Sequence, residues 1–298
     1  MFTGLSAFPL TPLASDGSID EAAFARLVRF AAEAKVDSIC ALGSTGCYAY
    51  FNRAERARVA RIARFSAADT PVMIGIGAVR LREVLELAED AQQAGAGALL
   101  LAPSSYHALN DEEVFGLYEA VSRNISIPLC VYDNPGTTNF IFSDELHGRI
   151  ASLPNIGSIK IPGVPADPGE AEKRVANLRS LIPEHVTIGV SGDSSAVAGL
   201  LAGCDAWYSV IGGLFPNTAQ AIARAAQAGD AAEAHRLSNR LAPLWSMFEA
   251  ANGSLRVVAA AAEVQGFAWS PCLPAPLQPL QGEARYTLFR LIKELAID

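Results

Sequence analysis

The chain has 298 residues, of which 51% are hydrophobic and 18% are charged, proportions typical of a globular protein with a sizeable apolar core. The formal net charge is −8 and no basic run stands out, which argues against a nucleic-acid partner and favours a small-molecule ligand. Because no leader-like segment opens the chain and no apolar run approaches the ~20 residues of a membrane helix, we expect a cytoplasmic protein without membrane contact.

Short runs rich in Val, Ile and Leu alternate along the chain with segments that carry apolar residues at helical spacing. Eight strands are expected, beginning near Leu5, Ser38, Val72, Ala98, Leu129, Ile156, Val186 and Ala206. The expected helices between them cover residues 20–34, 53–65, 81–94, 111–121, 144–151 and 169–181. Near-continuous apolar strands are typical of a parallel sheet covered by helices, so the pattern predicts an α/β fold, a (β/α)₈ TIM barrel.

Only helices are expected after the eighth strand, near residues 218–228, 231–250, 254–264 and 284–295. We therefore expect a catalytic barrel over residues 1–220 and a C-terminal helical extension, packed on the barrel, over residues 221–298. The sequence leaves open whether these helices cap the barrel or form a subunit contact.

The cysteines and histidines show no pattern typical of a disulfide framework or a metal site. The five cysteines include no CxxC pair, and the four histidines share no ligand spacing. We expect reduced, buried thiols and no bound metal.

One lysine stands in an unusual setting. The chain has only four lysines, and Lys160 alone is flanked by isoleucines, Ile159 and Ile161, at the end of the sixth strand. A lysine inside a barrel loses hydration, which lowers its pKa and leaves a neutral amine able to attack a ketone. The alternative is a side chain that extends from the strand end into solvent.

Two other strand ends carry polar groups suited to act beside that amine. Tyr132 ends the fifth strand, where its hydroxyl would shuttle protons, although a packed ring with a loop hydrogen bond is the alternative. The segment Gly43-Ser44-Thr45-Gly46 follows the second strand, and its backbone N–H groups and hydroxyls suit a carboxylate. A tight connection without a ligand would have the same composition.

These three segments, in this order, resemble the dihydrodipicolinate synthase and N-acetylneuraminate lyase family of pyruvate-dependent class I aldolases. The resemblance extends from Phe8-Pro9-Leu10-Thr11-Pro12 through the helical extension. It implies a (β/α)₈ barrel with a helical tail, usually assembled as a homotetramer. It further implies that Lys160 forms a Schiff base with a keto acid, that Tyr132 relays protons, and that Ser44 and Thr45 bind the carboxylate. No organic cofactor is expected, because the lysine itself serves as the electron sink.

The resemblance also suggests roles at three later strand ends. Tyr106, after the fourth strand, is the candidate for an aromatic hydroxyl that completes a neighbouring subunit's proton relay; a surface aromatic is the alternative. Asp193 would contact substrate hydroxyls, although it could simply cap the following helix. Tyr208 or Ile211 would line the pocket floor.

Two positions depart from the family pattern. Where the family often reads PGRT after the tyrosine, this chain reads Pro135-Gly136-Thr137-Thr138, so the arginine that holds the second substrate's carboxylate in true dihydrodipicolinate synthases is absent. Cys47 stands where many members carry an acidic residue. The missing arginine argues against synthesis in the lysine pathway, and Cys47 argues against the family's usual distal substrate contacts.

The leading hypothesis is a Schiff-base lyase, an aldolase or dehydratase, that acts on pyruvate or a 2-keto-3-deoxy acid. A true 4-hydroxy-tetrahydrodipicolinate synthase and a non-catalytic keto-acid-binding barrel are alternatives. A phosphate-binding barrel is a third, since glycine-rich loops follow strands seven and eight.

Overall fold

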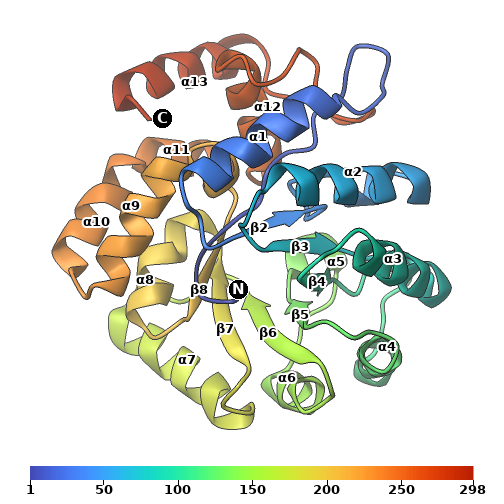
Figure 1. Cartoon of the computed structure of the whole chain (residues 1–298). Coiled ribbons are helices and arrows are strands. Elements are labelled where there is room, and N and C mark those ends of the chain that lie inside the picture. The colour runs from blue at the N-terminus through green and yellow to red at the C-terminus, as the bar shows by residue number, and fades with distance from the viewer. Residues whose placement is uncertain (298) are drawn as a thin grey trace.

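The computed structural model describes residues 1–297, which form a closed barrel of eight parallel strands in sequence order (Figure 1). The strands are β1 (Gly4–Ala7), β2 (Ser38–Ala41), β3 (Val72–Gly75), β4 (Ala98–Leu101), β5 (Leu129–Tyr132), β6 (Ile156–Ile161), β7 (Thr187–Ser191) and β8 (Ala206–Ser209). Every expected strand start lies within one residue of the observed one, so the predicted eight-stranded barrel is confirmed.

Helices surround the strands (Figure 1). They are α1 (Glu21–Glu33), α2 (Arg53–Ser66), α3 (Leu81–Gln93), α4 (Asp111–Ser122), α6 (Asp144–Ala151), α7 (Pro168–Leu181), α8 (Ala196–Leu201) and α9 (Pro216–Gln227). Local chemistry sets several starts: Asn52 and Asn110 each form a reciprocal capping box with the glutamate three residues later. The six helices expected between strands are confirmed, whereas α8 was not predicted because six residues are too few to show a helical period.

Two apolar layers form the core. The larger lies between the strands and the surrounding helices. The smaller fills the barrel interior and includes Phe8, Cys40, Cys130, Tyr132 and Tyr208. All five cysteines are free and buried, as predicted. The barrel interior is therefore a packed space into which only a few polar side chains project.

The extension contains α10 (Ala231–Arg240), α11 (Ala242–Ala250), α12 (Leu255–Val264) and α13 (Gly282–Leu295). The single helix predicted over 231–250 was wrong, because α10 ends at Arg240 and Pro243 lies in the first turn of α11. A proline has no N–H and clashes with the preceding turn, so it belongs at a helix start. The boundary expected at residue 220 falls inside α9, which packs on β1 and completes the eighth β/α unit.

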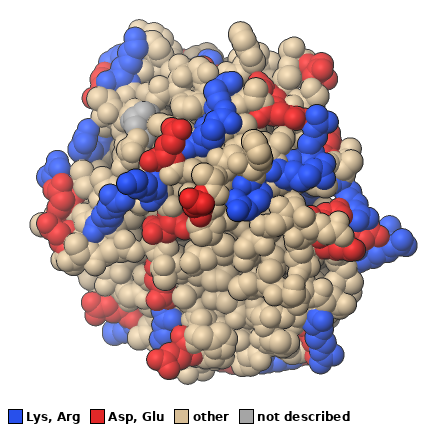
Figure 2. All heavy atoms as spheres, in the orientation of Figure 1, with Lys and Arg blue, Asp and Glu red and all other residues tan. Residues whose placement is uncertain are grey.

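In the face seen in Figure 2, Lys and Arg lie interspersed with Asp and Glu over the upper half and along the sides, and the region below the centre is largely uncharged. The N-terminus lies within the ring of strands in the same view (Figure 1).

Over residues 1–297, no helix is long and apolar enough to span a membrane.

Candidate active site

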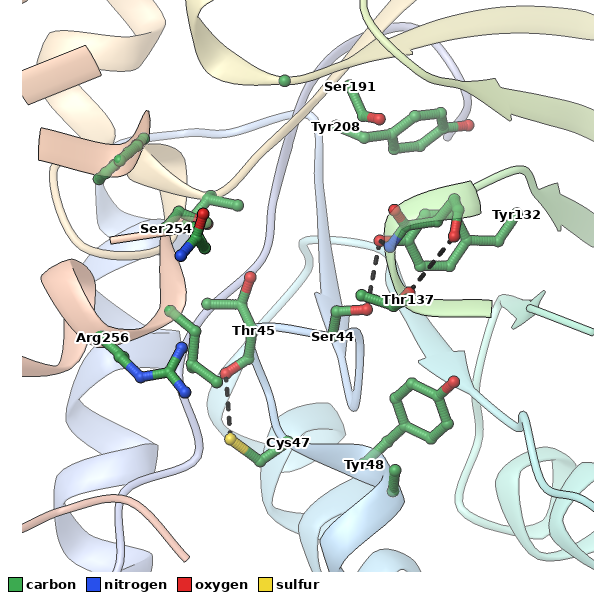
Figure 3. Close-up of a pocket in the computed structure, with 18 of the residues that line it drawn as sticks. Ser44, Thr45, Cys47, Tyr48, Tyr132, Thr137, Ser191, Tyr208, Ser254 and Arg256 are labelled. Carbon is green, nitrogen blue, oxygen red and sulfur yellow. Dashed lines mark hydrogen bonds between the residues drawn. The ribbon is translucent and has the colours of Figure 1, made fainter. Parts of the chain in front are cut away.

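A pocket of about 810 Å³ opens at the carboxyl ends of the strands. Its inner wall comes from the ends of β5, β6 and β8 and the loop after β2, and it includes Lys160, Tyr132, Tyr208, Ser44 and Thr45. Figure 3 labels the last four of these residues. Its outer wall comes from α11, α12 and the turn between them. Because active sites of such barrels lie at this end, the pocket is the candidate active site.

Lys160 lies at the inner end of the pocket and is only 3% exposed. Its Nζ atom is 4.2 Å from the ring centre of Tyr132, 5.3 Å from that of Phe8 and 5.8 Å from that of Tyr208. Burial lowers the pKa of Lys160 from its ordinary value of 10.5 to about 8, although nearby thiol and carboxyl groups oppose the shift. A neutral amine is therefore accessible near physiological pH.

Tyr132 is the neighbour of Lys160 across the β5–β6 ladder. Its hydroxyl donates to Ser44 Oγ at 3.3 Å and accepts a hydrogen bond from Asn134 Nδ2 at 2.8 Å. Burial raises the pKa of Tyr132 to about 12, so the phenol keeps its proton and can pass it along this chain of groups. The structure thus brings together the three segments singled out in the sequence.

The loop after β2 owes its shape to small residues. A Cβ atom on Gly43 would lie 2.7 Å from the Phe8 ring, and one on Gly46 would lie 3.0 Å from the Leu42 backbone nitrogen. Cys47, which ends the loop, has a left-handed backbone with φ 54°. Gly43 and Gly46 allow this turn but are not among the residues that line the pocket, so their predicted contribution to carboxylate binding stays a prediction, whereas Ser44, Thr45 and Cys47 line the cavity.

Asp193 lines the pocket, but its carboxylate is used by the protein itself. Oδ1 accepts from Trp207 Nε1 at 3.0 Å and from the Val210 N–H at 3.1 Å, and Oδ2 accepts from the Ile211 N–H at 2.8 Å. These bonds tie the loop after β7 to the end of β8. The backbone donors that a phosphate would need after β8 are therefore already occupied.

Two further predicted residues do not reach the pocket. The Ile211 side chain is fully buried in the outer core, and the adjacent Val210 lines the cavity instead. Tyr106 is 88% exposed, packs edge-on against His107 and does not line the pocket of its own chain. Its expected role across a subunit contact stays a prediction.

Several pocket residues were not anticipated. Tyr48 donates to or accepts from Ser104 at 2.6 Å, and the buried Arg56 lies against the Tyr48 ring. Trp245 and Arg256 belong to the C-terminal extension and also line the pocket. No local sequence pattern predicts that these two residues lie at the mouth of the barrel.

Comparison with known proteins agrees with this geometry. A model of the dihydrodipicolinate synthetase family matches residues 1–295. The chain belongs to this family. Its fold matches dihydrodipicolinate synthase from Agrobacterium tumefaciens with a TM-score of 0.94 and 44% identity, over 99% of this chain and 98% of that one. It is 34% identical to 4-hydroxy-tetrahydrodipicolinate synthase of Methylococcus capsulatus, over 78% of this chain and 79% of that protein.

A third relative was solved with a ligand. The chloride-inhibited dihydrodipicolinate synthase from Acinetobacter baumannii, complexed with pyruvate, has a TM-score of 0.89 and 27% identity over the full length of both chains. Membership of the dihydrodipicolinate synthase family makes this chain a class I lyase, which works through a lysine Schiff base.

Proposed function

We propose that Lys160 is the Schiff-base lysine, that Tyr132 relays protons to and from the reacting atoms, and that Ser44 and Thr45 hold the carboxylate of pyruvate or of a 2-keto-3-deoxy acid. The observation that carries this proposal is the buried Lys160 amine at the inner end of the pocket, with its pKa lowered to about 8. The pyruvate complex of the Acinetobacter baumannii relative supports the choice of keto acid.

The chemistry follows from the amine. Lys160 Nζ attacks C2 of the keto acid, and the carbinolamine loses water to form a protonated imine. The imine draws electrons from the neighbouring bonds, so loss of a proton from C3 gives an enamine. C3 of the enamine then attacks the carbonyl carbon of an aldehyde, and hydrolysis of the new imine releases the product and the amine. Cleavage follows these steps in reverse, and an enamine with a hydroxyl group at C4 can instead expel it as water.

Tyr132 is suited to the proton transfers in this sequence. Its hydroxyl lies in a hydrogen-bonded chain between Asn134 and Ser44, and its ring contacts the Lys160 amine. A phenol in this place would donate a proton to the departing hydroxyl group of the carbinolamine and recover it later.

The second reactant is proposed not to be aspartate semialdehyde. Thr137 lines the pocket in the segment where the family's synthases carry the arginine that grips that substrate's carboxylate, and a threonine offers no bidentate donor. The name of the Methylococcus capsulatus relative favours the synthase reaction as the second candidate.

A substrate panel separates the two candidates. Purified protein is offered 2-keto-3-deoxy acids, with pyruvate release and dehydration products measured, and in parallel pyruvate with aspartate semialdehyde. Turnover of a 2-keto-3-deoxy acid with little condensation of the semialdehyde supports the proposal. Efficient condensation of aspartate semialdehyde would replace it with the synthase reading, and trapping of pyruvate without any turnover would favour a keto-acid-binding protein.

A further inference from the structure

Arg256 occupies the outer wall of the same pocket. It belongs to the first turn of α12, where Ser254 forms no side-chain cap, and it lines the cavity together with Ser254 and Leu255. Figure 3 shows its guanidinium pointing from α12 toward the part of the pocket that carries Thr45 and Cys47. Arg256 and Lys160 are the two cationic side chains that line this cavity.

The Arg256 guanidinium has no partner within the part of the chain that the structure describes. No salt bridge or side-chain hydrogen bond joins it to any of residues 1–297, although Glu249 lies on the same outer wall. Arg179 and Arg149, by contrast, bind Asp205 at 2.5 Å and Glu112 at 2.7 Å, respectively. Arg256 is exposed, and it differs from other exposed arginines without such a partner, such as Arg224, because it lines the cavity. An unpaired guanidinium that faces a ligand cavity offers a planar set of donors for a carboxylate or similar anion.

The wall opposite Arg256 carries no competing negative charge. Cys47 lies on that wall, and burial raises the pKa of its thiol to about 12, so the thiol is neutral at physiological pH. The Asp193 carboxylate lies deeper and is occupied by three N–H donors. A ligand's far end would therefore meet the Arg256 guanidinium and the neutral Cys47 thiol, with the Glu249 carboxylate on the same outer wall as Arg256.

The size of the pocket leaves room for such a far end. Pyruvate has three carbons, and a cavity of about 810 Å³ belongs to the range that holds much larger ligands. Lys160 at the inner end and Arg256 at the outer wall can then contact two different groups of the same ligand.

We propose that Arg256 is a specificity-determining residue that binds a second carboxylate at the far end of the substrate, so that the preferred substrates are dicarboxylic 2-keto acids. This inference rests on the proposed imine at Lys160. It assigns the anion-binding role to the helical extension instead of the loop after β5, where Thr137 stands.

The test compares keto acids that differ only at the far end. 2-Oxoadipate and 2-oxohexanoate have six carbons each and end in a carboxylate and a methyl group, respectively. For each compound, the concentration that half-saturates borohydride trapping on the protein is measured by intact mass. We expect a half-saturating concentration about 10- to 100-fold lower for 2-oxoadipate, which is the range of charge-assisted hydrogen bonds.

Variants at Arg256 test whether this residue causes the preference for 2-oxoadipate over 2-oxohexanoate. Arg256→Met should bring the ratio between the two keto acids close to one, and Arg256→Lys should keep part of it, because the charge remains without the planar fork. Using the ratio within each variant cancels any general loss of imine formation. Arg224→Met, which removes an exposed arginine of α9 away from the pocket, is the matched control and should keep the wild-type ratio.

The outcomes separate the two proposals. Wild-type protein that traps both six-carbon acids equally well, or an Arg256→Met variant that keeps the preference, would overturn the role of Arg256 and leave the Schiff base intact. Protein that traps no keto acid would overturn the proposed function. Calorimetric titration with the same two acids needs no imine, so it decides for or against Arg256 in that case as well.

Discussion

The amine of Lys160 is placed where its charge is costly. Among residues 1–297 it has no hydrogen-bond partner, and the contacts closest to it are the faces of Tyr132, Phe8 and Tyr208. Aromatic faces attract an ammonium group, yet removal from water outweighs this attraction. A fall in pKa from 10.5 to about 8 corresponds to about 3 kcal/mol against the charged form.

The first prediction concerns pH. Because only the neutral amine attacks a ketone, the rate of enamine formation should rise about tenfold per pH unit below pH 8 and level off above it. Exchange of the pyruvate methyl protons in D₂O, followed by NMR between pH 6 and 9.5, measures this rate. A rate that keeps rising tenfold per pH unit up to pH 9.5 would show that the lysine has an ordinary pKa.

Tyr132 carries the second prediction. Tyr132→Phe keeps the ring against Lys160 but removes the hydroxyl that joins Ser44 and Asn134, so kcat should fall by about 10²- to 10³-fold. Steady-state kinetics with the substrate found in the panel measures the loss. Tyr50→Phe removes an exposed phenol at the edge of the same pocket and serves as the control. Equal kcat values for Tyr132→Phe and wild type would remove Tyr132 from the mechanism.

At the scale of elements, the turns after β7 and β8 depend on one carboxylate. Asp193→Ala would leave the Trp207 indole N–H and the backbone N–H groups of Val210 and Ile211 without their acceptor. Buried donors without partners are costly, so the free energy of unfolding should fall by about 2–4 kcal/mol.

Urea denaturation of the same variant measures that loss. Asp69→Ala, at an exposed aspartate that makes none of these contacts, is the comparison and should change stability by less than about 0.5 kcal/mol. If Asp193→Ala is as stable as wild type but binds keto acids poorly, the carboxylate acts on substrate hydroxyls, as the family resemblance suggested, and is not a structural anchor.

The elements were predictable to the extent that their signals are local. Buried parallel strands are short apolar runs, and capping residues such as Asn52 and Asn110 mark helix starts, so the barrel could be derived from the sequence. The break between α10 and α11 lies at Pro243, which stands within a run of residues that is otherwise helical in pattern, so the pattern alone indicates one continuous helix. Helix α8 is too short for its period to be visible.

The site residues were also predictable only where their signals are local in the sequence. Lys160, Tyr132 and Ser44 each end a strand or follow one, and the barrel brings strand ends together. Arg256 and Trp245 lie far along the chain on helices of the extension. Their contribution to the pocket depends on how the extension folds back over the barrel mouth, and no short-range pattern encodes that path.

At the scale of the whole molecule, the proposed assembly is a homotetramer. Large apolar side chains such as Phe65, Tyr106 and Ile141 are 79–89% exposed in one chain, and subunit contacts are one way to cover them. Analytical ultracentrifugation should give a mass about four times the 31.4 kDa of one chain. A species of 31.4 kDa that is fully active would exclude any role for Tyr106 across a subunit contact.

The central claim is that Lys160 forms an imine with pyruvate, and reductive trapping tests it most directly. Wild-type protein and Lys160→Met are incubated with saturating pyruvate and borohydride, and digested peptides are analysed by mass spectrometry. The account predicts a stable adduct on the peptide that contains Lys160 in the wild-type protein and no adduct in the variant. An unmodified Lys160 peptide under saturating pyruvate, or an adduct on another lysine, would contradict it.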